Sequence, residues 1–416
     1  MKKNILLATT GESPQVITET LYALHHESQQ WPDEIFLITT TLGETRARVG
    51  LLEQSHLARL CDEIGKPVPE FDARHILVVP DANGQPVDDA RSLEDHEALA
   101  NFIMTTVRDL TAVDSQTVHA SLAGGRKTMT FYMGYAMSLF GRRQDNLSHV
   151  LISKGYESLR EFWYPSIRQD QLRDYDGKPL ITVDGKPLMP ADALVTLAPI
   201  PFVRHRQNLP ALLPQSGSAI HFRDLVRLIN LGDLPDELHL CIDLPNQRIV
   251  VQDTESPLQF EFKPSLLALA FYVMMARATL GAEKEITRPS KKRAHTGLLK
   301  DLLDELLPLC GLTRCENWKS GLEQLIDWNE LKGHLKDSTL DALGNGITDT
   351  WFDQRKGELR KAFEEKLPAR VCGWLTPEII WSEDGDRLTE PGSTKGGGYG
   401  IPLLIGNIDL IDCPSV

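Results

Sequence analysis

Apolar runs and helix-like segments alternate along the first 155 residues of the chain. Runs with little polar alternation, typical of strands buried on both faces of a sheet, occupy residues 4–10, 34–39, 75–79, 116–121 and 147–152. Segments with apolar residues at helical spacing occupy residues 16–24, 44–64, 93–111 and 127–140. Strands that alternate with helices in this way predict an α/β domain with a Rossmann-like, doubly wound parallel sheet over residues 1–155.

The pattern loses this regular alternation after residue 160. We predict a helix at 221–230, a hairpin with strands at 238–242 and 248–252, a strand at 260–262 and an apolar helix at 265–280. This order of elements is similar to that of a winged-helix unit. The alternative interpretation is a structural subdomain without a binding function. Amphipathic helices follow at 297–308, 318–334 and 353–366, and then a strand at 401–405. We therefore expect a mixed α+β, mainly helical C-terminal region, divided into residues 156–282 and 283–416.

Two polar turns follow the first and the fourth predicted strands. Residues 9–15 are Thr-Thr-Gly-Glu-Ser-Pro-Gln, and residues 121–128 are Ser-Leu-Ala-Gly-Gly-Arg-Lys-Thr. The carboxyl ends of parallel strands meet at one edge of a sheet, which is where ligands bind in this fold class. The sequence therefore predicts that both turns line one pocket.

The second turn has the features of an anion site. A strand that turns through Gly124 and Gly125 into a helix leaves backbone N–H groups unpaired at the helix N-terminus, where the macrodipole favours negative charge. Arg126 and Lys127 add two positive charges in the same turn. A tight turn with two solvated basic residues is the alternative. The chain has no Walker Gly-Lys-Ser/Thr motif, and the first turn lacks Gly-x-Gly-x-x-Gly, which argues against an NTPase or dinucleotide site.

Composition narrows the classes of function. The formal net charge of −14 argues against a general nucleic-acid coat protein, because such binding rests on many phosphate contacts. The longest apolar runs, such as 266–275, are shorter than the ~20 residues that span a bilayer, and no export signal is visible. The six cysteines form no Cys-x-x-Cys pair, so we expect a reducing cytoplasm and neither a zinc site nor disulfides.

The two turns carry a resemblance to a known family. Residues 1–155 resemble a CARF domain, the Rossmann-like sensor domain of CRISPR-associated proteins from type III systems. The resemblance lies in Leu-Leu-Ala-Thr-Thr-Gly-Glu-Ser-Pro-Gln at 6–15 and Gly-Gly-Arg-Lys-Thr-Met at 124–129. The second stretch is the more specific, since it is similar to the ligand loop of that family. The whole chain resembles CRISPR-associated ring nucleases, in which such a domain precedes a less characterised C-terminal region.

This resemblance implies an antiviral defence protein that binds cyclic oligoadenylate across a homodimer and cleaves it. A twofold dimer presents each basic turn twice, which matches a ring of even symmetry. Cyclic tetra-adenylate, with four phosphates, is the favoured ligand, and the sequence leaves the ring size open. Cleavage would need no metal and no cofactor, because a ribose 2′-hydroxyl attacks its own phosphate once it is held in line.

The resemblance and the chemistry together assign roles to the turn residues. We expect Lys127 to stabilise the charge of the phosphorane, with Arg126 as a second candidate. Thr10 and Ser13 are expected to hold the phosphate or orient the 2′-hydroxyl. His119, in the fourth strand, is expected to pack structurally rather than act as a base. The remaining ligand-binding candidates are Thr9, Gly11, Glu12, Gln15, Gly124, Gly125 and Thr128.

Many proteins with this sensor carry a HEPN ribonuclease domain with the motif Arg-x(4–6)-His. Arg288 and His295 meet this spacing, but so do pairs inside the sensor part, where the motif has no meaning. The spacing of Arg288 and His295 is therefore no more frequent than expected by chance and does not by itself indicate a HEPN domain. The alternative for the basic cluster Arg288, Lys291, Lys292 and Arg293 is a solvated turn or a local contact for RNA.

Three functions follow from these patterns. The first is a ring nuclease that ends signalling, and it needs nothing beyond residues 1–155. The second is a ring-activated HEPN-type ribonuclease effector, which would act on RNA. The third is a ligand-responsive regulator that binds nucleic acid through the winged-helix-like segment.

Overall fold

The chain folds into two compact units, residues 1–209 with 213–223 and residues 210–212 with 224–416. The computed structural model describes residues 2–157, 159–169, 171–174, 176–182, 185–215, 217, 220–281, 286–291, 293–393 and 397–413. Lys292, in the predicted basic cluster, and Ala282, at a predicted boundary, lie outside the described residues. The predicted boundaries after residues 155 and 282 stay predictions.

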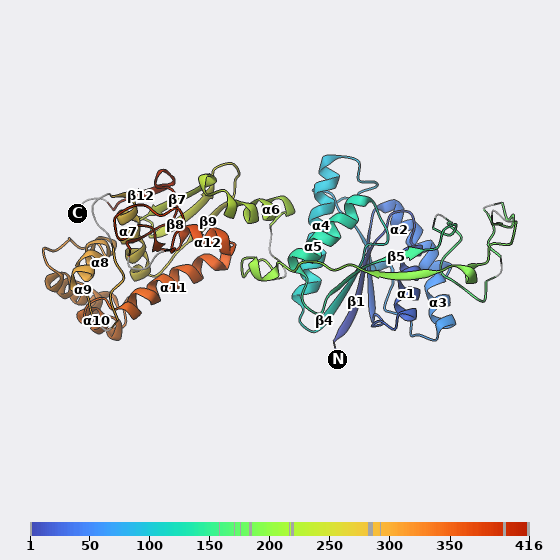
Figure 1. Ribbon diagram of the computed structural model, residues 1–416, viewed down its shortest axis with the longest axis horizontal. Coiled ribbons are helices and arrows are strands. Elements are labelled where there is room, and N and C mark those ends of the chain that lie inside the picture. Colours follow the sequence, from blue (N-terminus) through green and yellow to red (C-terminus); the bar gives the residue numbers. More distant parts are fainter. Residues whose placement is uncertain are drawn as a thin grey trace. The chain divides into compact units, whose positions relative to one another are not determined.

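The first unit is built on a six-stranded sheet with strand order β3-β2-β1-β4-β5-β6 (Figure 1). Strands β1 to β5 pair in parallel, and β6 pairs antiparallel with β5. Their bounds are β1 Lys3–Thr9, β2 Glu34–Thr39, β3 Ile76–Val78, β4 Gln116–Ser121, β5 Asn146–Ile152 and β6 Val195–Pro199. The predicted α/β fold with a parallel sheet is confirmed, and the antiparallel β6 was not predicted.

Helices cover both faces of this sheet (Figure 1). On one face α1 packs against α3, and on the other α4 packs against α5. Their bounds are α1 Gln15–His26, α2 Thr41–Ala47, α3 His56–Ile64, α4 Leu93–Ala112 and α5 Lys127–Phe140. Because β1 lies in the middle of the sheet with helices above and below it, Leu6 and Leu7 are fully buried although they point to opposite faces.

The helix predicted at 44–64 is divided into three pieces. A π-helical turn, η1 (Arg48–Glu53), separates α2 from α3, and Ser55 in the left-handed region (φ 59°) precedes α3. Trp163 packs directly on this turn, since a Cβ on Gly50 would lie 2.2 Å from a Trp163 ring carbon. The prediction of one continuous helix is therefore wrong at residues 48–55.

The second unit contains a mixed sheet with strand order β12-β7-β8-β9 and a mainly helical remainder. The strands are β7 Leu238–Asp243, β8 Arg248–Asp253, β9 Gln259–Phe262 and β12 Ile408–Ile411, and β10 Glu378–Ile379 pairs with β11 Tyr399–Gly400. The helices are α7 Leu266–Leu280, α8 Thr296–Leu309, α9 Trp318–Lys332, α10 Asp337–Gly344, α11 Asp349–Lys366 and α12 Ala369–Leu375. The predicted hairpin is β7–β8, flanked by β9 and by β12, which pairs in parallel with β7.

The remaining elements are short or lie at the junction of the units. Helix α6 (Phe222–Asn230) begins at the end of the first unit. The 3₁₀ turns are η2 Ala73–His75, η3 Pro190–Asp192, η4 Arg206–Asn208, η5 Leu231–Asp233, η6 Pro235–Glu237 and η7 Ile405–Asn407. The predicted strand at 401–405 is wrong, because Pro402 has no N–H for a ladder and the strand forms at β12 instead. None of the described helices is both long and apolar enough to cross a membrane.

Candidate functional site

The two polar turns lie side by side at the carboxyl ends of β1 and β4. These strands are neighbours, and the strand order reverses between them, which is the switch point where such sheets bind ligands. The Thr9 hydroxyl donates a hydrogen bond to the Gly124 carbonyl oxygen at 2.7 Å. A Cβ on Gly124 would lie 2.8 Å from the Thr9 carbonyl oxygen, and one on Gly11 would lie 3.9 Å from the Gly125 Cα. The two turns therefore share one edge of the sheet, as predicted, whereas a pocket lined by both of them stays a prediction.

Each turn leads into a helix whose N-terminus lacks a side-chain cap. Helix α1 begins after Pro14 and α5 begins after Arg126, and neither residue caps its helix through a side chain. The backbone N–H groups of Lys127 and Thr128 have no acceptor among the described residues. Because α1 and α5 start at adjacent strands, the positive ends of two helix dipoles meet at this edge. The arrangement suits an anion.

The first turn is held together by its own polar groups. Thr10 is fully buried, and its hydroxyl donates to the Ser13 carbonyl oxygen at 2.9 Å. Its backbone N–H donates to the Ile38 carbonyl oxygen at 3.0 Å. Ser13 and Glu12 are exposed, and Glu12 lies 3.9 Å from the Arg160 guanidinium. In this structure Thr10 shapes the turn, whereas Ser13 is open to a ligand.

Two buried polar atoms beside the turns have no hydrogen-bond partner among the described residues. They are Oε1 of Gln15, at the start of α1, and Oγ1 of Thr128, in the first turn of α5. Gln15 is 8% exposed, and its Nε2 donates to the Arg160 carbonyl oxygen at 2.7 Å, which fixes the amide and leaves Oε1 as an acceptor. Buried polar atoms are rarely left unpaired, so these two oxygens suit hydrogen bonds to a ligand.

The two basic residues of the second turn differ in their surroundings. Arg126 forms an ion pair with Asp89, in the loop between β3 and α4. Arg91 also donates to Asp89, at 2.8 Å, and the hydrogen bonds from Arg91 and Arg126 lower the pKa of that carboxyl group. Lys127 is exposed and has no acidic partner among the described residues. Sequence reasoning missed Asp89, because no local pattern connects it with a turn so far along the chain.

His119 lies away from the two turns. Its Nε2 is 2.7 Å from the Ser148 hydroxyl oxygen, across β4 and β5. Burial lowers the pKa of His119 to about 4, so the imidazole is neutral at pH 7. Besides packing there, it lines a cavity near the amino ends of the strands, which the sequence did not predict.

One group of metal-ligating side chains in the described part of the chain has the spacing for an ion. Glu34, Glu70 and His75 bring one ligand atom each within 4.8 Å of one another. The Lys3 ammonium lies 2.9 Å from a Glu34 oxygen and 3.2 Å from a Glu70 oxygen. The Lys3 ammonium thus forms ion pairs with both carboxylates, so the group is an ion-pair cluster in this structure.

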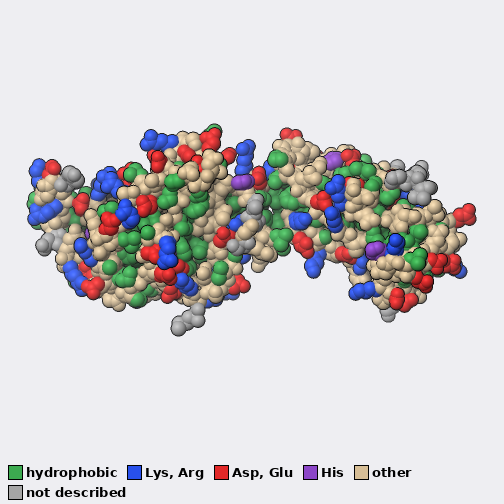
Figure 2. All heavy atoms as spheres, turned by 180° about the vertical axis from the view of Figure 1, so that it is seen from behind, with side chains coloured by type: hydrophobic (Ala, Val, Ile, Leu, Met, Phe, Trp, Pro, Cys, Tyr) green, Lys and Arg blue, Asp and Glu red, His purple; other side chains and the backbone are tan. Residues whose placement is uncertain are grey.

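The residues of the HEPN-like spacing have structural partners in the second unit. Arg288 donates to Asp353 at 2.8 and 2.6 Å, and this pairing raises the pKa of the guanidinium. The Nδ1 of His295 accepts the backbone N–H of Leu298 at 2.8 Å and so caps α8. On the face in Figure 2, basic and acidic side chains are interspersed. Arg288 and His295 thus serve the fold of this unit.

Comparison with models of protein families identifies a family for this chain. A sequence model of the family described as CRISPR-associated protein NE0113 matches residues 13–229, just over half of the chain. The matched residues include the second polar turn and begin at Ser13 in the first one. No curated protein matches the chain.

Proposed function

Because the chain belongs to the CRISPR-associated protein NE0113 family, we propose that it is a type III ancillary protein whose CARF-like first unit binds cyclic oligoadenylate and cleaves it. Cleavage removes the messenger and ends antiviral signalling. The observation that carries this proposal is the meeting of two uncapped helix N-termini beside an unpaired lysine, Lys127, at the switch point of the sheet.

The turns offer what a ring of adenylates requires. Phosphate oxygens accept hydrogen bonds from the backbone N–H groups at the start of α5 and attract the Lys127 ammonium. The buried Oε1 of Gln15 accepts a hydrogen bond, which a ribose hydroxyl or an adenine amino group would donate. Charge and hydrogen-bonding capacity therefore match a nucleotide with phosphodiester groups.

The reaction is an internal transfer at phosphorus. The ribose 2′-oxygen forms a bond to the adjacent phosphorus as the bond to the 5′-oxygen breaks, and the proton lost by the 2′-hydroxyl is balanced by one gained by the 5′-oxygen. The products are a 2′,3′-cyclic phosphate end and a free 5′-hydroxyl. Lys127 stabilises the negative charge that builds up on the phosphorane, and the backbone groups keep the phosphate in line.

Assembly as a homodimer completes the site in this proposal. Cyclic tetra-adenylate has an even number of phosphates, and a twofold axis through the pocket brings two copies of each turn around one ring. Light scattering with and without the ring measures this directly. A stable monomer under both conditions contradicts the shared site.

Replacing Lys127 tests the catalytic assignment. We expect Lys127→Ala to slow cleavage of cyclic tetra-adenylate by ~10²–10³-fold, whereas binding weakens less because the backbone donors remain. Lys127→Arg keeps the charge and should recover part of the rate. Lys66→Ala is the matched control, since it removes one exposed lysine next to the C-terminus of α3. Cleavage by Lys127→Ala at the wild-type rate would refute the assignment.

The same assay separates the other two functions. Arg288→Ala and His295→Ala should leave ring cleavage unchanged, because both residues belong to the second unit. Labelled RNA is incubated with the protein, with and without the ring. If the ring switches on RNA cleavage and His295→Ala removes it, the effector function replaces the one proposed here. If the ring instead changes how much intact nucleic acid the protein binds, the regulator function replaces the one proposed here.

A further inference from the structure

A cavity lies near the amino ends of β4 and β5, at the opposite edge of the first sheet from the polar turns. Asn146 is the first residue of β5, Pro199 ends the antiparallel β6, and Gln29 follows the end of α1. The cavity measures about 330 Å³, within the range of small-molecule sites. Its lining residues are Gln29, His119, Asn146, Leu147, Ser148, Leu197, with residues 199–202 and Arg204.

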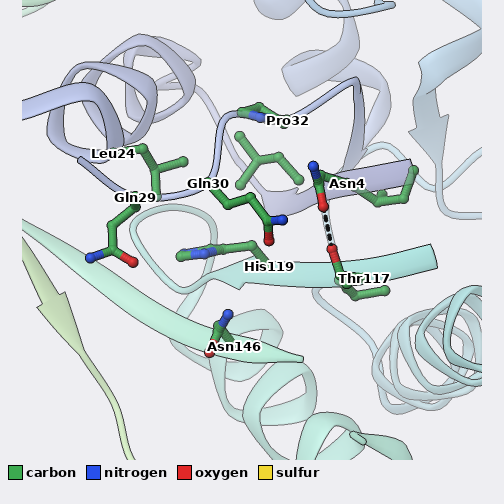
Figure 3. A pocket seen from close by; sticks show the side chains of 11 residues that line it. Asn4, Leu24, Gln29, Gln30, Pro32, Thr117, His119 and Asn146 are labelled. Carbon is green, nitrogen blue, oxygen red and sulfur yellow. Dashed lines mark hydrogen bonds between the residues drawn. The ribbon is translucent and has the colours of Figure 1, made fainter. Parts of the chain in front are cut away.

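A second, smaller cavity lies beside this one toward the start of β1, and Figure 3 shows the side chains that line it. The two share Gln29, His119 and Asn146. In the close-up His119 projects from β4 toward Gln29, with Asn146 below it on β5. Thr117 and Asn4 close the far end through a hydrogen bond of 2.7 Å. His119 therefore stands at the junction of the two spaces.

Two uncharged polar side chains of the cavity have hydrogen-bonding atoms without a partner among the described residues. With Nε2 of His119 bound to Ser148, its Nδ1 has no partner among the described residues. The Asn146 side chain is exposed and likewise has no hydrogen-bond partner in the described part of the chain. A carboxamide presents a donor and an acceptor side by side, which is the complement of the amino group and N7 of adenine.

The charged group at this cavity is already engaged by the protein itself. Arg204 is the one charged residue among the lining residues. Its guanidinium packs over the Phe202 ring at 4.2 Å and donates to the carbonyl oxygens of Arg142 and Asp145 at 2.9 and 3.0 Å. The C-terminus of α1, just before Gln29, places the negative end of a helix dipole nearby. A neutral ligand with a flat apolar body fits these surroundings best.

We propose that this cavity binds an uncharged purine nucleoside, with Asn146 and His119 bonded to the edge of the base and Leu197, Ile200 and Phe202 against its faces. The site is separate from the polar turns and does not depend on the function proposed for them. Both sites lie in the first unit, so both are present in every copy of the chain.

Calorimetric titration of the full chain with adenosine, uridine and AMP tests the class of ligand. We expect adenosine to bind once per chain, uridine to bind about tenfold more weakly, and AMP to bind no more tightly than adenosine. Excess cyclic tetra-adenylate should leave adenosine binding in place. AMP bound much more tightly than adenosine, or no binding of adenosine, overturns the proposal.

Two matched tryptophan variants test the location. Ile200 lines the cavity and is half-buried, so Ile200→Trp fills the space and should abolish adenosine binding. Val203, three residues on, is 66% exposed and not among the lining residues, so Val203→Trp should bind like wild type.

Asn146→Ala should weaken adenosine binding about tenfold. Ring cleavage should stay unchanged in all three variants, which separates this test from that of the turns. Adenosine binding by a folded Ile200→Trp, judged by circular dichroism, overturns the location.

Discussion

The two edges of the first sheet differ in the kind of polar group that they offer. At the carboxyl edge the groups are backbone N–H groups of two helix starts and the exposed Lys127. At the amino edge they are mainly neutral side chains, His119, Ser148 and Asn146, in a cavity lined by both polar and apolar groups. The difference follows from the direction of the chain, since helices that return from parallel strands point their positive ends to the carboxyl edge. In the two proposals made above, one sheet therefore serves an anionic ligand at one edge and a neutral ligand at the other.

Gly124→Ala should disrupt the contact between the two turns at the carboxyl edge and leave the cavity at the amino edge unchanged. The new Cβ would lie 2.8 Å from the Thr9 carbonyl oxygen and 2.9 Å from Val16, so the two turns must separate. We expect ring binding to fall by about 100-fold and unfolding to require about 1–3 kcal/mol less free energy. Calorimetry and urea unfolding measure the two effects.

Gly134→Ala is the matched control on α5. Its Cβ would meet only the Leu122 Cδ1, at 3.9 Å, and alanine favours the helix. Ring binding by this variant should equal that of wild type. If Gly124→Ala also binds the ring normally, the close approach of the turns is irrelevant to the ligand.

Glu19 lies within α1, the helix that starts at the first polar turn, and should make the stability of the protein depend on pH. It is 6% exposed, and burial raises its pKa from 4.5 to about 8. Between these values the folded state binds more protons than the unfolded state, so the free energy of unfolding falls as pH rises. Glu19→Gln should remove this fall and gain roughly 2–4 kcal/mol over wild type above pH 8.

Urea unfolding over a series of pH values measures this effect. Glu27→Gln is the control, because Glu27 is exposed just after the end of α1. Parallel pH profiles of Glu19→Gln and wild type would show that Glu19 is not protonated in the folded protein.

Asp89→Asn should have the smallest effect of these changes, and it should affect ligand binding at the carboxyl edge only. The change releases Arg126 from its ion pair and raises the positive charge of the second turn. We expect the ring to bind roughly threefold more tightly at low salt, with the gain lost at high salt, and adenosine binding to be unaffected. Asp88→Asn removes the same charge from the exposed neighbour. An equal gain from both variants would show a general charge effect instead.

The first sheet was predictable because its apolar runs are separated by clear helical segments. Strands β2 and β4 and helix α5 begin and end where the pattern placed them. Strand β6 was missed because more than 40 residues separate it from β5 in the sequence, and its pairing depends on a partner that no local pattern specifies. The strand expected at 401–405 does not form, because Pro402 has no N–H to donate to a neighbouring strand.

The sequence predicted where the two turns of the candidate site lie, but it did not predict most of the contacts that their side chains make. The two turns could be placed together because both follow parallel strands. The ion pair of Arg126 with Asp89, the burial of Thr10 and the unpaired oxygen of Gln15 arise from contacts between distant segments. The amino-edge cavity has no sequence signal, since its walls come from β4, β5, β6 and two loops.

The parallel pairing of β12 with β7 has a consequence for how the protein is made. Once residue 199 has left the ribosome, all six strands of the first sheet are available, and this unit can fold while translation continues. The second sheet must wait, because Ile408 pairs with Leu240 and β7 keeps an open edge until β12 has been synthesised. The nascent second unit therefore carries an unpaired strand edge for longer than the pairing of β7 with β8 alone would require.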